Sequence, residues 1–191
     1  MGVSSSSSYY ANKSRLNELL QARSIRRGDF TLASGRRSSF YIDARTTTMS
    51  AEGLAVIGPM GLDRIQARGW VPRFVGGLTL GADPVAYAVA VAAYGRGVAL
   101  DAFTVRKQAK DHGTGKRLEG CFATGGDVVI VEDVITTGQS AQDAIAAVQA
   151  EGGRILGILA VVDREEGGKA ALEQAGYGVE ALITATELGL R

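Results

Sequence analysis

Short apolar runs alternate with amphipathic segments along most of the chain. Uninterrupted apolar runs lie at 128–131 and 155–162, and residues 98–105 form another β-prone segment. Residues 50–69 and 84–94 instead carry their apolar side chains at helical spacing. Strands that are apolar throughout occur where helices cover both faces of a parallel sheet. The pattern therefore predicts an α/β fold with a mainly parallel sheet flanked by helices.

The first part of the chain departs from this alternation. Leucines at near-helical spacing predict a helix that begins at Ser14. Two β-prone pieces at 30–32 and 39–42, bordered by glycine turn signals, predict a hairpin. The serine-rich residues 1–13 are expected to form a flexible tail.

The remaining residues, 14–191, are expected to form a single domain. The chain of 191 residues is long enough for one hydrophobic core, and no repeat or linker divides it. We expect a small N-terminal unit over about residues 14–45 and a core over about residues 50–191.

Charge and cysteine content exclude several classes of protein. The 21 basic and 20 acidic residues give a formal net charge of +1, too small to indicate binding to nucleic acid or to a membrane surface. No apolar run reaches the ~18 residues of a membrane span. The single cysteine, Cys121, excludes an internal disulfide and fits a reducing compartment. We therefore expect a cytoplasmic protein.

Polar, glycine-rich residues follow four of the predicted strands. They occupy residues 76–83, 106–120, 132–140 and 163–168. In an open parallel sheet, ligands bind beyond the carboxyl ends of the strands. We therefore expect one site, assembled from these four loops.

The segment VVIVEDVITTGQSA carries the most specific chemistry. The hydroxyl groups of Thr136, Thr137 and Ser140, with the free N–H groups of the helix that begins there, suit a phosphate. Glu132 and Asp133 would repel that phosphate, so we expect them to accept hydrogen bonds from hydroxyl groups or to face a developing cation. A sugar phosphate supplies both partners. The alternative is a strand end with solvated acids and an ordinary helix cap; a Walker A loop and a dinucleotide fingerprint do not fit.

This segment resembles the phosphoribosyl diphosphate signature of type I phosphoribosyltransferases. Within that superfamily, FTVRKQAKDHGTGKRLEG is similar to the mobile catalytic loop of orotate phosphoribosyltransferase, and GDFTLASGRRSSFYIDAR resembles its N-terminal hood. The resemblance covers about residues 16–164. It implies the type I phosphoribosyltransferase fold and a glycosyltransferase (pentosyltransferase) of UMP biosynthesis. That enzyme uses Mg²⁺ and transfers phosphoribosyl from 5-phosphoribosyl diphosphate (PRPP) to orotate, giving orotidine 5'-phosphate and diphosphate.

The resemblance also implies roles for residues at matching positions. The ribose and 5-phosphate would contact Glu132, Asp133, Thr136, Thr137, Gly138, Gln139 and Ser140. The diphosphate would contact Arg106, Lys107, Lys110, His112, Gly81 and Ala82, and orotate would contact Ser34, Tyr41, Thr136 and Arg164. Catalysis would depend on Lys107, Asp133, Arg106, Lys110 and His112. No protein ligand for Mg²⁺ is implied, because the diphosphate carries the ion, and a homodimer would share the catalytic loop between subunits.

Several alternatives remain open at this stage. Arg164 could belong to a surface ion-pair run with the acids around it, and Tyr41 could serve only to pack the hood. Some family members have lysine where this chain has Gly81 and Ala33, which removes two cations near the ligands. The chain could be a phosphoribosyltransferase for another base, or a regulatory protein that senses PRPP and binds RNA. The hood and the basic RKQAK loop argue against another base. The near-zero net charge and the complete catalytic loop argue against a regulatory protein that binds RNA.

Overall fold

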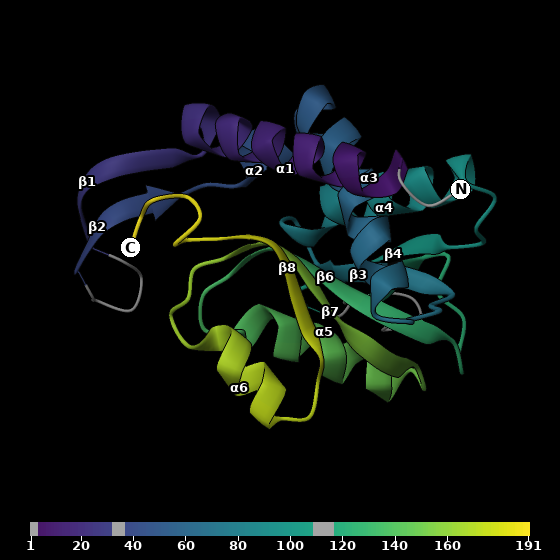
Figure 1. Cartoon of the computed structure of the whole chain (residues 1–191). Helices are drawn as coiled ribbons and strands as arrows, with labels where there is room; N and C mark the ends of the chain where they lie inside the picture. The colour runs from purple at the N-terminus through teal and green to yellow at the C-terminus, as the bar shows by residue number, and fades with distance from the viewer. Residues whose placement is uncertain (1–3, 32–36, 109–116) are drawn as a thin grey trace.

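A computed structural model describes residues 4–31, 37–108 and 117–191, and the predicted α/β architecture is confirmed (Figure 1). Six strands form the main sheet in the order β5-β4-β3-β6-β7-β8. The strands are β3 (Phe74–Leu78), β4 (Asp101–Val105), β5 (Leu118–Gly120), β6 (Asp127–Ile135), β7 (Arg154–Asp163) and β8 (Val179–Thr184). All neighbours are parallel except β4 and β5. The short antiparallel edge strand β5 was not predicted.

Helices cover both faces of this sheet (Figure 1). One face packs against α3 (Ala51–Ala67) and α4 (Ala82–Gly95), and the other against α5 (Gln139–Ala150) and α6 (Gly168–Gln174). Each face of the sheet has its own hydrophobic core, and alternate residues of β6 pack into each. Val129 and Val131 pack with α3 and α4, and Val128 and Ile130 pack with α5 and α6. The run is apolar throughout because both of its faces are buried.

The predicted hairpin is present as a separate two-stranded sheet. Strands β1 (Ile25–Thr31) and β2 (Arg37–Ile42) pair antiparallel, and a short helix α2 (Arg45–Thr48) follows. Figure 1 shows this hairpin, the hood, extending from the sheet, with the C-terminal end of the chain beside it. The hood therefore lies next to the main sheet instead of joining it.

The first helix is longer than the sequence predicts. Helix α1 spans Ser4–Arg23 and begins ten residues before Ser14, so the prediction of a flexible tail over residues 1–13 is wrong for residues 4–13. Tyr9 explains part of the difference, because its hydroxyl accepts a hydrogen bond of 2.7 Å from Nε of Arg64 on α3. Tertiary contacts thus extend a helix whose serines have modest helix propensity.

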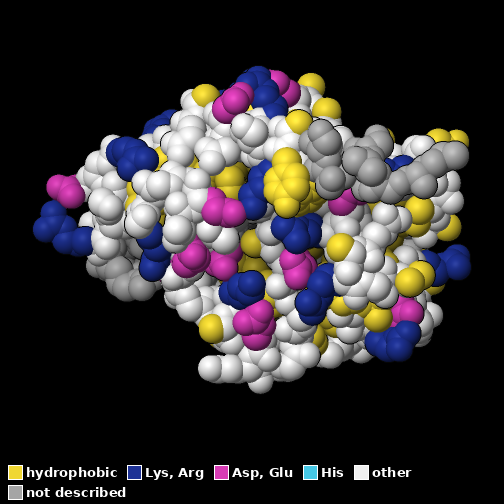
Figure 2. Space-filling view, in the orientation of Figure 1, with side chains coloured by type: hydrophobic (Ala, Val, Ile, Leu, Met, Phe, Trp, Pro, Cys, Tyr) yellow, Lys and Arg dark blue, Asp and Glu magenta, His cyan; other side chains and the backbone are white. Residues whose placement is uncertain are grey.

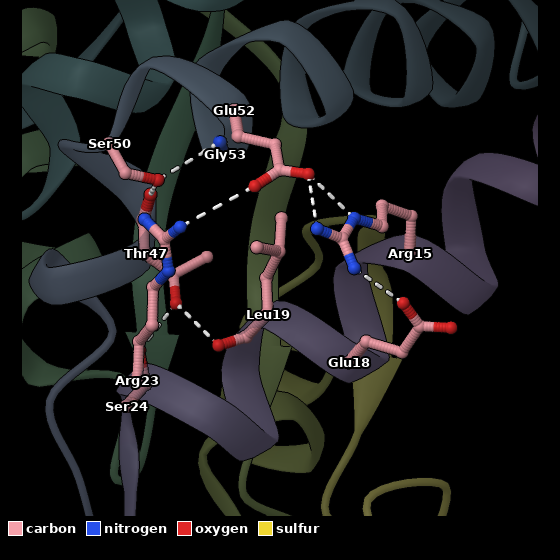
Figure 3. A network of polar contacts seen from close by, with 9 residues as sticks. All are labelled: Arg15, Glu18, Leu19, Arg23, Ser24, Thr47, Ser50, Glu52 and Gly53. Carbon is pink, nitrogen blue, oxygen red and sulfur yellow. Dashed lines mark hydrogen bonds and ion pairs between the residues drawn. The ribbon is translucent and has the colours of Figure 1, made fainter.

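A polar network attaches α1 to the corner between α2 and α3 (Figure 3). Glu52, in the first turn of α3, accepts hydrogen bonds from Arg15 and Arg23 of α1. Beneath this exposed cluster, the buried hydroxyl groups of Ser24 and Thr47 lie 2.7 Å apart. Exposed ion pairs contribute under ~1 kcal/mol each, so the buried pair is the more specific link. The network holds the end of the hood against the core.

Two residues in the helices over the first face act differently from their usual sequence signals. Pro59 lies inside α3, and the helix continues through it. Asp83 lies in the first turn of α4, but the N-cap is Gly81, and no side chain caps it. The Asp83 carboxylate instead accepts hydrogen bonds from Thr79 at 2.7 Å and from Thr104 at 2.8 Å. Asp83 therefore ties the loop after β3 to β4.

Candidate functional site

The loops after β3, β4, β6 and β7 meet in one cleft of about 610 Å³, together with the end of the hood. Its lining residues are Tyr41, Ile42, Asp43, Ala44, Arg45, Leu78, Thr79, Leu80, Gly81, Lys107, Glu132, Asp133, Val134, Thr136, Ser140 and Arg164. The carboxyl ends of parallel strands share one edge of the sheet, so these loops converge as the sequence predicts.

Two acids near the end of β6 line the cleft, Glu132 buried and Asp133 half-buried. Glu132 is 5 % exposed, and its Oε1 has no hydrogen-bond partner within the described residues. Burial, with smaller contributions from Asp133 and Asp143, raises the pKa of Glu132 to about 8. Burial also raises the pKa of Asp133, although the Val134 N–H donates to its Oδ1 at 2.8 Å. A ligand that offers hydroxyl donors or positive charge here would stabilise both carboxylates.

Asp133 lies directly against the first turn of α4. A Cβ placed on Gly81 would be 2.5 Å from Oδ1 of Asp133, so a larger residue at this position requires the carboxylate to move. The backbone at the start of α4 therefore approaches the acid closely. Glycine makes this approach possible at a position where the sequence resemblance points to lysine in some relatives.

The turn between β6 and α5, beside the acids, is the candidate anion site. Residues 134–141, with Glu132, line a smaller cleft of about 70 Å³ that shares several residues with the larger one. Gly138 has a φ of +83°, a left-handed conformation that glycine adopts without strain. This turn directs the first N–H groups of α5 toward the cleft, where a phosphate can accept them.

Of the predicted cationic residues that the structure describes, Lys107 and Arg164 line the large cleft and Arg106 does not. Lys107 lines the cleft at the end of β4. Arg106 is not among the described lining residues, and its Nη1 lies 3.5 Å from Oε1 of Glu119. Arg164 also lines the cleft, but its side chain is only 5 % exposed and forms an ion pair with Glu166, which is 8 % exposed. The alternative of a surface ion-pair run is therefore wrong for Arg164, because the pair is buried.

The other predicted residues fall into four groups. Tyr41, Thr136 and Ser140 line the large cleft, and Thr137, Gly138 and Gln139 line the small one. Ala82 is buried at the start of α4 and lines neither cleft. Ser34, Lys110, His112 and Ala33 lie outside the described residues.

Sequence reasoning missed one charged pair in the large cleft. Arg45 donates from Nε and Nη2 to Asp43 at 2.8 and 3.0 Å, and this neighbour lowers the pKa of Asp43. Both residues line the cleft beside the two acids. The Asp-Ala-Arg sequence directly after the hairpin was the available signal.

The surface shows no concentration of one charge on the face in view. Figure 2 shows basic and acidic side chains interspersed over that face, in the orientation of Figure 1. Such a mixture is unlike the basic stripe that a nucleic acid requires. Among the described residues, no helix is long and apolar enough to cross a membrane.

Known proteins match this chain over nearly its whole length. Orotate phosphoribosyltransferase of Rhodopirellula baltica is 42 % identical over 176 residues, which cover 90 % of this chain and 91 % of that protein. The chain belongs to the orotate phosphoribosyltransferase family. No protein-family model matches it.

Solved structures support the family assignment. The crystal structure of Mycobacterium tuberculosis orotate phosphoribosyltransferase in complex with PRPP has a TM-score of 0.78 and 40 % identity, over 94 % of this chain and 99 % of that one. Adenine phosphoribosyltransferase of Leishmania donovani has a TM-score of 0.61 at 16 % identity, which shows the shared fold alone. The predicted family, fold and enzyme class of this chain are thus confirmed.

Proposed function

We propose that the orotate phosphoribosyltransferase reaction of this protein takes place in the large cleft, with PRPP spanning both clefts. The observation that carries this proposal is that Glu132 and Asp133 line the same cleft as Lys107 and Arg164, while Glu132 also lines the small cleft formed by the turn at the start of α5. A phosphorylated sugar with a second anionic group fits this set of charges. PRPP has that composition.

Each part of PRPP has a partner in this arrangement. Its 5-phosphate accepts hydrogen bonds from the turn of residues 136–140, and its ribose hydroxyl groups donate to Glu132 and Asp133. Its diphosphate lies beyond the acids, near the backbone of Gly81 and the ammonium group of Lys107. Lys110 and His112, with Arg106, would add donors from the rest of that loop, as the family resemblance implies.

The chemistry follows from these positions. A ring nitrogen of orotate attacks C1 of the ribose, the C1–O bond to diphosphate breaks, and diphosphate leaves with the bonding electrons. The proton of the ring nitrogen passes to a diphosphate oxygen. Positive charge that develops on the ribose lies over the carboxylates of Glu132 and Asp133, while negative charge develops near Lys107. Preorganised charges of this kind are worth about 10²–10³ in rate for each donor.

Orotate would occupy the remaining side of the cleft. Tyr41 from the hood and Arg164 after β7 both line it, and a guanidinium fork matches a carboxylate well. The orotate ring would lie against Tyr41, with Thr136 also within the lining. Ser34 is assigned to this side by resemblance alone.

Mg²⁺ would be carried mainly by the diphosphate. No group of three or more His, Cys, Asp or Glu side chains in the described part of the chain is placed to hold a metal ion. A hard cation of this kind retains waters and prefers phosphate oxygens, which the diphosphate supplies. The ion would neutralise charge on the leaving group.

A homodimer that shares the loop after β4 would use the outer face of α3 and α4. Leu54, Pro59, Tyr87 and Val91 form an apolar groove there, and Val91 is 72 % exposed. Tyr87 also contacts Thr104 of β4, so a partner seated on this groove lies near the diphosphate side of the cleft. Val91→Asp is expected to convert a dimer into a monomer in sedimentation velocity, and an unchanged dimer would contradict this surface.

We place the reaction in the cytoplasm. Cys121 is a free, exposed thiol, which is compatible with a reducing compartment.

The direct test is a spectrophotometric assay of purified protein with orotate, PRPP and Mg²⁺. We expect orotate to be consumed and its consumption to require PRPP. Adenine in place of orotate is the control for base specificity. No loss of orotate, or equal turnover with adenine, would refute the proposed substrate.

A further inference from the structure

The guanidinium group of Arg164 is held on two sides before any ligand binds. Its Nε donates to Oε1 of Glu166 at 2.9 Å, and its Nη2 lies 2.7 Å from the same oxygen. The ring of Phe40, on β2 of the hood, covers one face, with its centroid 4.8 Å from Cζ of Arg164. We infer that Glu166 and Phe40 are positioning residues, which hold the guanidinium group of Arg164 in the orientation that receives the carboxylate of orotate. This inference rests on the proposed function of the cleft.

The held arginine keeps donor capacity for a ligand. Nη2 is within ion-pair distance of Glu166, yet it makes no aligned hydrogen bond with any described residue. A buried guanidinium N–H group without an acceptor is costly, so this donor favours a ligand that supplies one. Arg164 lines the large cleft, and a planar carboxylate there can accept from the guanidinium edge.

The backbone around Arg164 is fixed independently of these two side chains. The Arg164 N–H donates to the Ile135 carbonyl of β6 at 3.0 Å. Glu165 has a φ of +57°, and its carboxylate accepts from the Thr186 N–H at 2.6 Å. Glu166 and Phe40 therefore act on the side chain of Arg164, because its main chain is already held by β6 and the C-terminal segment.

Charge alone does not account for Glu166. The carboxylate of Glu166 repels the carboxylate of orotate. If electrostatic attraction were the only requirement, a neutral residue beside Arg164 would bind orotate better. Glu166 instead holds a long, flexible side chain in one orientation, which lowers the entropy that substrate binding must remove. Phe40 restricts the same group from the hood, and it is itself buried. Orientation is therefore the physical role that fits both contacts.

Two variants of Glu166 separate orientation from charge. Glu166→Leu removes the acceptor and the charge, whereas Glu166→Gln removes the charge and keeps an acceptor oxygen. We expect Glu166→Leu to raise the KM for orotate about tenfold or more, with the KM for PRPP changed less than about twofold. Glu166→Gln should remain within about threefold of wild type for both substrates. Glu173→Leu, at a more exposed acid on α6, is the control for loss of a nearby carboxylate.

Phe40 supplies a second variant if Glu166→Leu does not fold. Phe40→Leu keeps an apolar side chain but removes the ring face, and we expect a rise of roughly three- to tenfold in the KM for orotate alone. Phe40→Tyr, which keeps the ring face, should keep the wild-type KM for orotate.

The outcomes distinguish failure of the positioning role of Glu166 and Phe40 from failure of the proposed function. If wild-type protein consumes no orotate, the proposed function fails. If it consumes orotate and Arg164→Leu raises the KM for orotate, while Glu166→Leu or Phe40→Leu leaves it unchanged or lowers it, the positioning role is overturned. An equal rise in the KM values for orotate and PRPP would also overturn it, because that result indicates a general structural defect.

Discussion

The buried carboxyl group of Glu132 should make the stability of the protein depend on pH. Its pKa of about 8 in the folded state lies well above its value of 4.5 in an unfolded chain. Below pH 4.5 the group is protonated in both states, and its full contribution to stability is present. Between pH 4.5 and about 8, the unfolded chain releases the proton while the folded protein keeps it, so the free energy of unfolding falls as pH rises.

The difference in pKa sets the size of this effect. A pKa difference of about 3.5 corresponds to roughly 5 kcal/mol at 1.36 kcal/mol for each unit. About 3 kcal/mol of that total falls in the accessible window between pH 5.5 and 8.5. Glu132→Gln has no proton to release and keeps the shape of the side chain. As pH rises across this window, the free energy of unfolding of the variant should therefore increase by about 3 kcal/mol relative to that of wild type.

Urea denaturation of the ligand-free proteins measures this difference. Trp70, which packs against the core, is the single tryptophan and provides the fluorescence signal. Titrations of wild type and Glu132→Gln at intervals from pH 5.5 to 8.5 give the free energy of unfolding at each pH. Glu173→Gln, at a half-exposed carboxylate on α6, is the control. If the difference between wild type and Glu132→Gln stays constant to within about 0.5 kcal/mol over the window, Glu132 is not held protonated by burial.

Three further predictions concern the reaction. Lys107→Ala should lower turnover about tenfold or more, with an unchanged urea midpoint, because Lys107 is exposed at the end of β4; full turnover would refute its role at the diphosphate. Mixing Lys107→Ala with Asp133→Asn subunits should restore activity through heterodimers that contain one intact site, and no recovery despite measured subunit exchange would argue against a shared site. Gly81→Lys should lower kcat/KM for PRPP instead of adding a useful cation, since its Cβ would meet Asp133 at 2.5 Å. Gly95→Lys, where a Cβ has open space at the other end of α4, is the control, and an equal effect of both changes would contradict the steric reason.

The sequence was most informative where local rules and tertiary packing agree. The apolar run before Glu132 could be predicted as a central strand because both of its faces are buried, and the glycine at 138 marks the left-handed turn that follows. These features place the acids and the anion site at the carboxyl edge of the sheet. That edge was predicted correctly from the order of strands and loops.

Other features depend on contacts between distant segments, which periodicity does not reveal. The start of α1 depends on Tyr9 meeting Arg64, and the role of Asp83 depends on Thr104 in the next strand. The ion pair of Arg164 and Glu166 looked from sequence like a solvated run of charges, but the surrounding structure buries it. Neighbours in space, not in sequence, decide such cases.

The segment after β8 connects parts of the molecule that lie far apart along the chain. Its backbone carbonyls accept hydrogen bonds from Asn17 and Gln21 of α1 and from Arg27 of the hood, and the Thr186 N–H reaches the residue next to Arg164. During synthesis on a ribosome, these partners of the segment emerge well before it does. The orotate side of the cleft can therefore reach its final form only after residues 184–189 have been made, well after the hood and Arg164 themselves.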